Sequence, residues 1–75
     1  MKELVEVIAK ALVNKPDAVE VTEEEKGERI ILTLKVDPED TGKVIGRGGR
    51  IAKALRAVVK AAAIKEDLQV ELEID

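Results

Sequence analysis

The chain has 75 residues, so we expect one small domain over residues 1–75 with a thin core. It contains no Cys, His or Ser and no aromatic residue, which excludes disulfides, base stacking on aromatic rings and the usual nucleophiles and bases of enzymes. We therefore expect no enzyme, no catalytic residue, no metal and no cofactor; a hydrolase or metal site built on carboxylates alone is an alternative without a supporting constellation. The net charge is −3, and the cysteine-free sequence without a membrane span or signal peptide suggests a cytoplasmic protein.

The predicted elements begin with an amphipathic helix over residues 2–13. Apolar residues recur there at helical spacing, and Pro16 prevents the helix from continuing. Residues 18–22 alternate as a strand, and an acidic turn with Gly27 at its tip follows. Residues 29–36 alternate more strongly, so the two strands are predicted to form a hairpin.

Two helices and a strand are predicted for the second half of the chain. Asp37 and Pro38 are typical of a helix start, so a short helix begins near residue 38 and ends at the glycines. A longer helix is predicted from Arg50 to Ile64, and residues 69–74 form the last strand. The apolar face predicted for the longer helix consists of Ile51, Leu55, Val58, Val59 and Ala62, with Lys53, Arg56 and Lys60 nearly opposite.

This order, α-β-β-α-α-β, predicts an α+β fold. The last strand is reached from the second through two helices, which is typical of a crossover between parallel strands. We expect a three-stranded mixed sheet with the second strand in the centre and all helices packed on one face.

The stretch VIGRGG, residues 44–49, places three of the five glycines between the two helices. Gly46 and Gly49 permit backbone conformations and close approaches that a Cβ would block. The helix that follows begins with unpaired N–H groups and the positive end of its dipole, which favours phosphate. The spacing fits neither a P-loop nor a dinucleotide fingerprint, and a simple glycine-capped turn between helices is the alternative.

Charge is segregated around this turn. The segment from Thr41 to Lys65 contains seven basic residues and no acidic one, so the rest of the chain carries −10 for the whole to reach −3. Such asymmetry indicates a positive surface that faces an anion. A lysine-rich helix face exposed to solvent is the competing interpretation.

The stretch GKVIGRGGRIAKALR, residues 42–56, resembles the signature of KH domains. Nearly the whole chain resembles the small stand-alone bacterial KH proteins of the KhpA type. The resemblance implies the type II KH fold and a Gly-x-x-Gly loop that clamps the backbone of about four single-stranded nucleotides. One departure is Ala52, where many KH domains carry isoleucine, with Ile51 one position earlier.

The resemblance also implies the residues of the site. The clamp consists of Gly46, Arg47, Gly48 and Gly49, and Lys60 lies beyond a site of four nucleotides. Val44, Ile45, Ile51 and Leu55 shape the apolar groove or support it. The residues expected at the RNA are Lys43, Val44, Ile45, Gly46, Arg47, Gly48, Gly49, Arg50, Ile51 and Lys53.

Two functions stay open at this point. The first is a non-enzymatic module that binds single-stranded RNA, with single-stranded DNA as a further ligand to test and no membrane contact. The second is a KH-fold dimerisation module with weak nucleic-acid binding, because the family self-associates and pairs with a larger KH-containing protein. Val7, Ile31 and Ile64 are the candidate contact residues for the second function. The regular Glu-, Lys-, Ala- and Val-rich composition is also typical of thermophilic, designed or consensus sequences.

Overall fold

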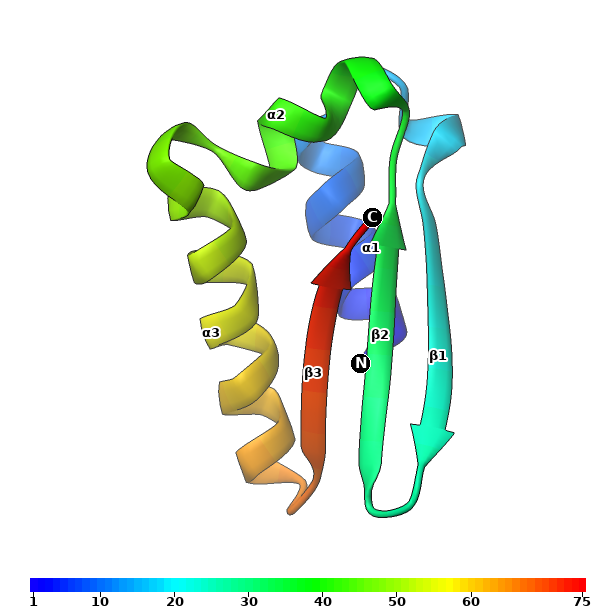
Figure 1. The fold of residues 1–75 in the computed structure, drawn as a ribbon, viewed down its shortest axis with the longest axis vertical. Helices are drawn as coiled ribbons and strands as arrows, with labels where there is room; N and C mark the ends of the chain where they lie inside the picture. Colours follow the sequence, from blue (N-terminus) through cyan, green and yellow to red (C-terminus); the bar gives the residue numbers. More distant parts are fainter.

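The computed structural model describes residues 1–75 and has the predicted α-β-β-α-α-β order in an α+β arrangement (Figure 1). Short 3₁₀ turns precede the first strand, the second helix and the third helix. The helices are α1 (Lys2–Leu12), α2 (Thr41–Ile45) and α3 (Arg50–Lys65), and the strands are β1 (Glu20–Lys26), β2 (Arg29–Lys35) and β3 (Gln69–Ile74).

The sheet has the order β1-β2-β3, so the predicted central position of the second strand is confirmed. β1 and β2 are antiparallel, with Val21 opposite Leu34. β2 and β3 are parallel, with Leu32 beside Leu72. Figure 1 shows α1 behind the sheet and α3 alongside β3, so the helices cover one face and leave the other open.

The core lies between the covered face of the sheet and the helices. Leu32 and Leu34 of β2 are fully buried there, and Val5 of α1 and Val59 of α3 pack against the same cluster. Burial of aliphatic side chains stabilises a fold by about 25 cal/mol per Å² of apolar surface. Since no aromatic residue is available, branched aliphatic side chains provide most of this burial.

The buried face of α3 differs from the predicted one. Val58 is 43% exposed, and Ile51 and Ala62 are only partly buried. Apolar size misled the prediction: the small residues Ala52 and Ala63 belong to the buried face, and the larger Val58 lies outside it. The fully buried residues of α3 are Ala52, Leu55, Val59 and Ala63.

β1 also differs from the prediction, because it covers Glu20–Lys26 and not residues 18–22. The acidic residues expected in the turn are paired with β2 along its length, up to Lys26 opposite Arg29. These acidic side chains remain exposed because β1 lies at the edge of the sheet. Alternation of buried and exposed residues therefore stops before the strand does.

The segment before α2 contains the predicted cap at Asp37 and a buried carboxylate, Asp40, that was not predicted. The Asp37 side chain accepts a hydrogen bond from the Glu39 backbone N–H at 2.9 Å, which confirms it as a cap. Asp40 is 1% exposed, the one buried charged residue. Its carboxylate accepts a hydrogen bond from the backbone N–H of Lys15 at 3.0 Å and lies 3.9 Å from the Lys43 ammonium. Asp40 thus joins the connection after α1 to the start of α2.

No helix combines the length and the apolar character needed to span a bilayer.

Candidate nucleic-acid interface

The loop between α2 and α3 consists of glycines with positive φ angles around one arginine. Gly46, Gly48 and Gly49 have φ angles of 76°, 64° and 78°. Gly46 ends α2 by donating its N–H to the Gly42 carbonyl at 2.9 Å, and Gly49 donates to the Gly46 carbonyl at 3.1 Å. Residues with a Cβ adopt such angles at a cost, so the loop conformation favours glycine at these positions.

Gly46 also lies against the first turn of α3. A Cβ on Gly46 would lie 2.7 Å from Cγ1 of Ile51 and 2.9 Å from its backbone nitrogen. A Cβ on Gly48 or Gly49 would meet no atom within 4 Å. The close contact therefore fixes the direction of the loop at Gly46, while the backbone at Gly48 and Gly49 stays open to a ligand.

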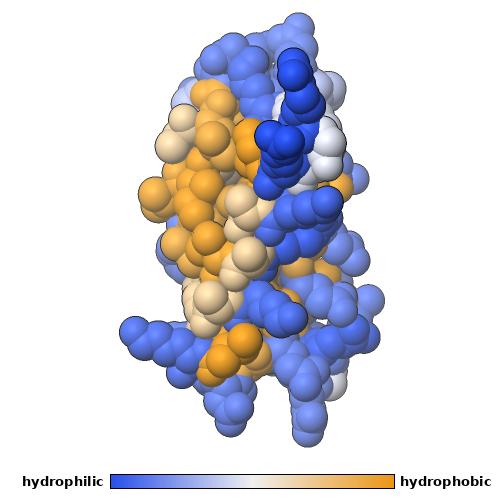
Figure 2. All heavy atoms as spheres, turned by 90° about the vertical axis from the view of Figure 1, so that its left-hand side faces the viewer, coloured by the Kyte–Doolittle hydropathy of each residue, from blue (hydrophilic) through white to orange (hydrophobic).

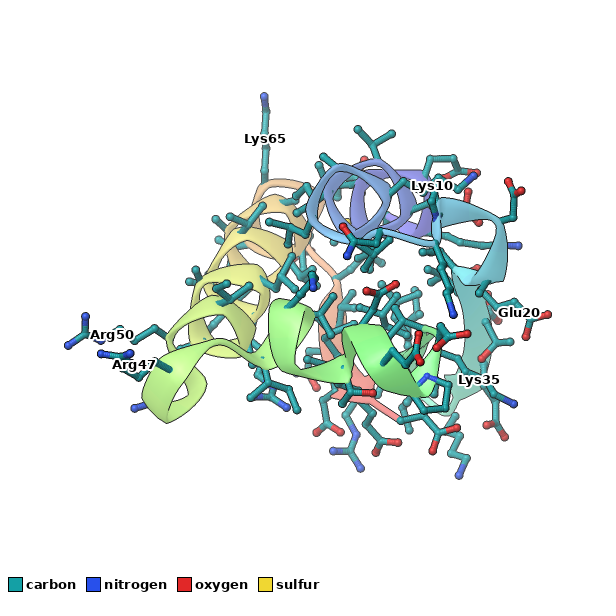
Figure 3. The ribbon with its side chains drawn as sticks, turned by 90° about the horizontal axis from the view of Figure 1, so that it is seen from above. Lys10, Glu20, Lys35, Arg47, Arg50 and Lys65 are labelled. Carbon is teal, nitrogen blue, oxygen red and sulfur yellow. The ribbon has the colours of Figure 1, made fainter.

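The N-terminus of α3 faces this open backbone. Gly49 precedes the helix, and no side chain caps the first N–H groups. The first N–H groups of a helix lack intrahelical partners and carry a partial positive charge, which favours anions. Figure 3 shows Arg47 and Arg50 extending outward from the loop, away from the rest of the molecule.

Most of the basic residues in this part of the chain have no carboxylate partner. Lys43 lies near Asp40, as described above. The other six have no Asp or Glu oxygen within 4.0 Å. Their charge is therefore available to an anion. These unpaired cations are Arg47, Arg50, Lys53, Arg56, Lys60 and Lys65.

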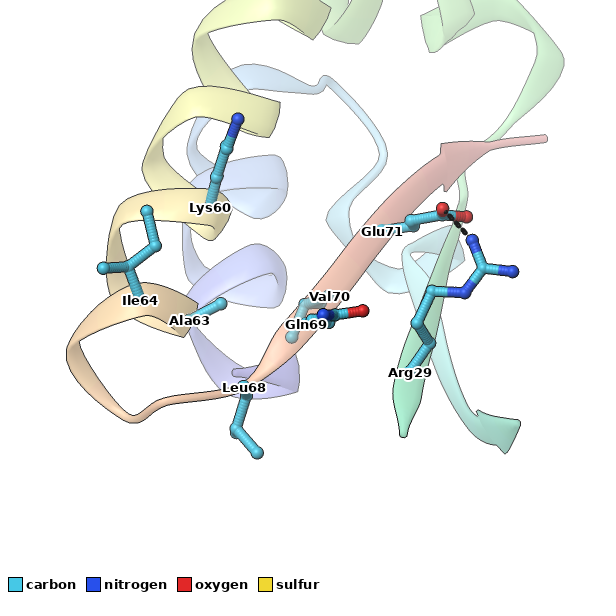
Figure 4. Close-up of a pocket in the computed structure, with 8 residues that line it drawn as sticks. All are labelled: Arg29, Lys60, Ala63, Ile64, Leu68, Gln69, Val70 and Glu71. Carbon is cyan, nitrogen blue, oxygen red and sulfur yellow. Dashed lines mark hydrogen bonds and ion pairs between the residues drawn. The ribbon is translucent and has the colours of Figure 1, made fainter. Parts of the chain in front are cut away.

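A groove runs between α3 and β3, from Arg56 toward the C-terminal end of the helix. We call it the α3–β3 groove and define it by Arg56, Lys60 and Ile64 of α3 and Val70, Leu72 and Glu73 of β3. Two adjoining hollows of about 450 and 320 Å³ form it, and both are lined by Lys60 and Val70. Figure 4 shows the lower part of the groove, with Lys60 and Ile64 on the helix wall.

The structure separates the predicted site residues into three groups. The loop residues Gly46–Gly49 and the exposed Arg50 and Lys53 lie at the open end of α3. Val44 is fully buried and Ile51 packs under Gly46 beside α1, so both can support the loop from behind. Ile45 is 37% exposed, and Lys43 is held near Asp40.

Sequence reasoning missed Arg56 and Lys60 as residues of the groove. The rotation of the buried face toward Ala52 and Ala63 places these two basic side chains beside β3 and not opposite the core. The spacing of Ala52, Leu55, Val59 and Ala63, with the alanines counted as core residues, could have indicated this orientation.

The fold and the loop together define a type II KH-like protein, and the comparisons with known proteins agree. The family described as "KhpA/KhpB, KH domain" matches residues 2–74. A protein of Clostridium perfringens named RNA-binding protein KhpA is 68% identical over 74 residues, which cover 99% of each chain. A protein of the same name from Aquifex aeolicus is 47% identical and covers 99% of this chain and 94% of its own. The chain therefore belongs to the KhpA/KhpB family of KH domains.

The structural comparison supports the fold alone. The chain superposes on Era from Aquifex aeolicus, bound to GDP and aluminium fluoride, with a TM-score of 0.56 and 17% identity. The match covers 97% of this chain and 28% of that chain. A second Era structure, in complex with a segment of 16S ribosomal RNA, matches with the same TM-score and 20% identity.

Proposed function

We propose that this protein is a non-enzymatic module that binds single-stranded RNA by clamping its backbone at Gly46–Gly49. The observation that carries the proposal is the uncapped N-terminus of α3 beside an open glycine backbone and six unpaired cations. The relatives' name, RNA-binding protein KhpA, supports the same ligand.

The geometry suggests a path for the RNA strand. Phosphates lie at the loop, where backbone N–H groups, Arg47 and Arg50 attract them. The strand then follows α3, whose Lys53, Arg56 and Lys60 offer further positive charge. About four nucleotides fit a KH groove, and the α3–β3 groove gives their bases a partly apolar wall at Val70.

The test is charge reversal inside the loop, Arg47→Asp with Gly48→Asp. Two carboxylates there would repel phosphate and face the positive end of α3. A matched control is available in the hairpin turn: Lys26→Asp with Gly27→Asp changes the charge equally. Gly27 has a φ of 61°, and a Cβ on it, as on Gly48, would meet no atom within 4 Å.

The loop variant is expected to lose RNA binding in fluorescence anisotropy, while its circular dichroism stays that of the wild type. The hairpin variant is expected to keep affinity within about threefold, since it lies at the far end of the sheet and only long-range charge acts there. Equal affinities of the two folded variants would contradict the clamp.

A second candidate function, self-association, is favoured by an apolar groove between α1 and α3. Figure 2 shows a continuous apolar band on the side of the molecule that carries α3. The groove has a volume of about 280 Å³ and is lined by Ile8 and Leu12 of α1 and by Ile51, Ala54, Leu55 and Val58 of α3, with Arg50 at its end. Apolar patches of this kind are typical of protein contacts.

The contact residues suggested by the sequence do not share this groove. Val7 and Ile64 are 69% and 68% exposed, and Ile31 is partly buried on the open face of the sheet. Sedimentation analysis of the wild type and of Val58→Asp tests a homodimer, or pairing with a larger KH-containing protein, through the groove. A wild-type monomer at all concentrations would contradict the homodimer.

A further inference from the structure

Arg56 is the one basic side chain of α3 that is fixed to the sheet. Its Nε–H donates a hydrogen bond to the Leu72 carbonyl of β3 at 3.2 Å in a partly buried position. A guanidinium has five N–H donors in one plane. The bond therefore uses one donor and holds the Nη groups, which have no protein partner, at a defined place in the α3–β3 groove.

The backbone of β3 offers further hydrogen-bonding groups at the same place. β3 pairs with β2 only, so its other edge is free. The Leu72 carbonyl points to this edge, because it meets Arg56 there and not β2. Free strand edges expose unpaired N–H and C=O groups, which can meet the edge of a nucleobase.

The charge on the strand wall favours a base over a phosphate. Glu71 and Glu73 both line the groove on this side. Glu71 forms an ion pair with Arg29, and Glu73 has no cation within 4.0 Å. A phosphate beside β3 would face this carboxylate, so the phosphates follow α3 and the loop while the bases turn toward Leu72.

We propose that Arg56 is a specificity-determining residue that selects bases with two adjacent hydrogen-bond acceptors. Cytosine presents O2 and N3, and guanine presents O6 and N7, to which a guanidinium can donate two parallel bonds. Adenine and uracil present an acceptor next to a donor and leave one Nη group unpaired. Recognition of the base by a fixed guanidinium loses little side-chain entropy on binding. The inference rests on the proposed RNA-binding function and names the bases that function prefers.

The experiment measures the affinity of the wild type, Arg56→Lys and the control Lys53→Gln. The probes are four labelled RNA octanucleotides: cytidine, alternating guanosine and uridine, adenosine, and uridine. The wild type is expected to bind the first two about 5- to 150-fold more tightly than the others, the usual discrimination of one bidentate pair. Arg56→Lys keeps the charge and is expected to lose this preference, with adenosine and uridine affinities within about twofold of wild type. Lys53→Gln should weaken all four complexes by one factor.

Three results would overturn the inference: no preference in the wild type, an unchanged preference in Arg56→Lys, or an equal loss for all four probes in Arg56→Lys. The last result would make Arg56 a phosphate contact. A thermal melt confirms that the variant is folded. If no probe binds the wild type at low salt, the proposed function fails together with this inference. Suppose instead that all four probes bind the wild type and that the loop variant with two aspartates abolishes binding. An unchanged base preference in Arg56→Lys would then contradict only the role of Arg56, and the proposed function would stand.

Discussion

The two ends of the five-residue helix α2 differ in whether their charged side chains have partners of opposite charge. At the N-terminal end, Lys15 lies 2.7 Å from Glu39 and 3.7 Å from Asp37, and Asp40 is buried between Lys15 and Lys43. At the C-terminal end, the arginines around the glycine loop have no carboxylate within 4.0 Å. Charges satisfied within the chain fix the position of α2, and charges left without partners are available to a ligand.

The largest expected effect on stability comes from removing the interactions of Asp40 at the N-terminal end of α2. Asp40→Ala removes a buried carboxylate and leaves the Lys15 N–H of a partly buried hydrogen bond without its acceptor, which is expected to cost about 1 to 3 kcal/mol of unfolding free energy. Urea denaturation measures the loss. Asp40→Asn keeps an oxygen acceptor and should lose less; equal losses would show that charge, and not the hydrogen bond, holds this end.

The cations without carboxylate partners at the C-terminal end of α2 and along α3 are expected to make RNA binding strongly dependent on salt. Contacts to about three or four phosphates of a single strand give a slope of log affinity against log salt of roughly −2 to −3. Affinity should then fall about 20- to 50-fold between about 50 and 200 mM salt. Fluorescence anisotropy over this range measures the slope, and a slope shallower than about −1 would mean that the cations contact no more than one phosphate.

Single neutralisations sharpen the comparison further. Arg50→Gln should make the slope shallower by up to about 0.7. From the sequence alone Lys60 lies beyond the site, but its place in the α3–β3 groove leads us to expect a similar change for Lys60→Gln. Lys35→Gln on β2 is the control. An unchanged slope for Lys60→Gln, with a changed one for Arg50→Gln, would restrict the site to the loop.

The smallest expected effect concerns Lys15. The hydrogen bond to Glu39, followed by the charge of Asp37, raises the pKa of the Lys15 ammonium above its ordinary value of 10.5. A raised pKa stabilises the fold at pH values below 10.5, and this contribution disappears as the pH rises through the raised value. The difference in urea midpoint between wild type and Lys15→Gln should be small at about pH 8 and should vanish at strongly alkaline pH, because exposed ion pairs contribute little. A difference that persists there would exclude the ion pair as its cause.

The sequence was sufficient to predict the order of the elements, the mixed sheet and the position of the glycine loop. Strong alternation in residues 29–36 and the turn chemistry at Asp37 are local signals, and both agree with the structure. The extent of β1 could not be predicted, because its acidic residues pair with β2 through the backbone and not through apolar side chains.

Much of the candidate site depends on relations that a sequence does not display. Whether a cation has a carboxylate partner depends on side chains brought together by the fold, as at Lys15 and Glu39, which are 24 residues apart. The orientation of α3 depends on the burial of the small residues Ala52 and Ala63, which apolar size in the sequence does not indicate. Both relations decide which basic residues face a ligand.

The two edges of the sheet have a consequence for how copies of the protein can assemble. Exposed strand edges are templates for pairing with another chain, and charged residues discourage such pairing. The β1 edge carries the run Glu23–Lys26, and the β3 edge lies beside α3 with its Leu72 carbonyl occupied by Arg56. Charge at the β1 edge and the bonded Leu72 carbonyl at the β3 edge therefore both discourage extension of the sheet by a strand from another copy.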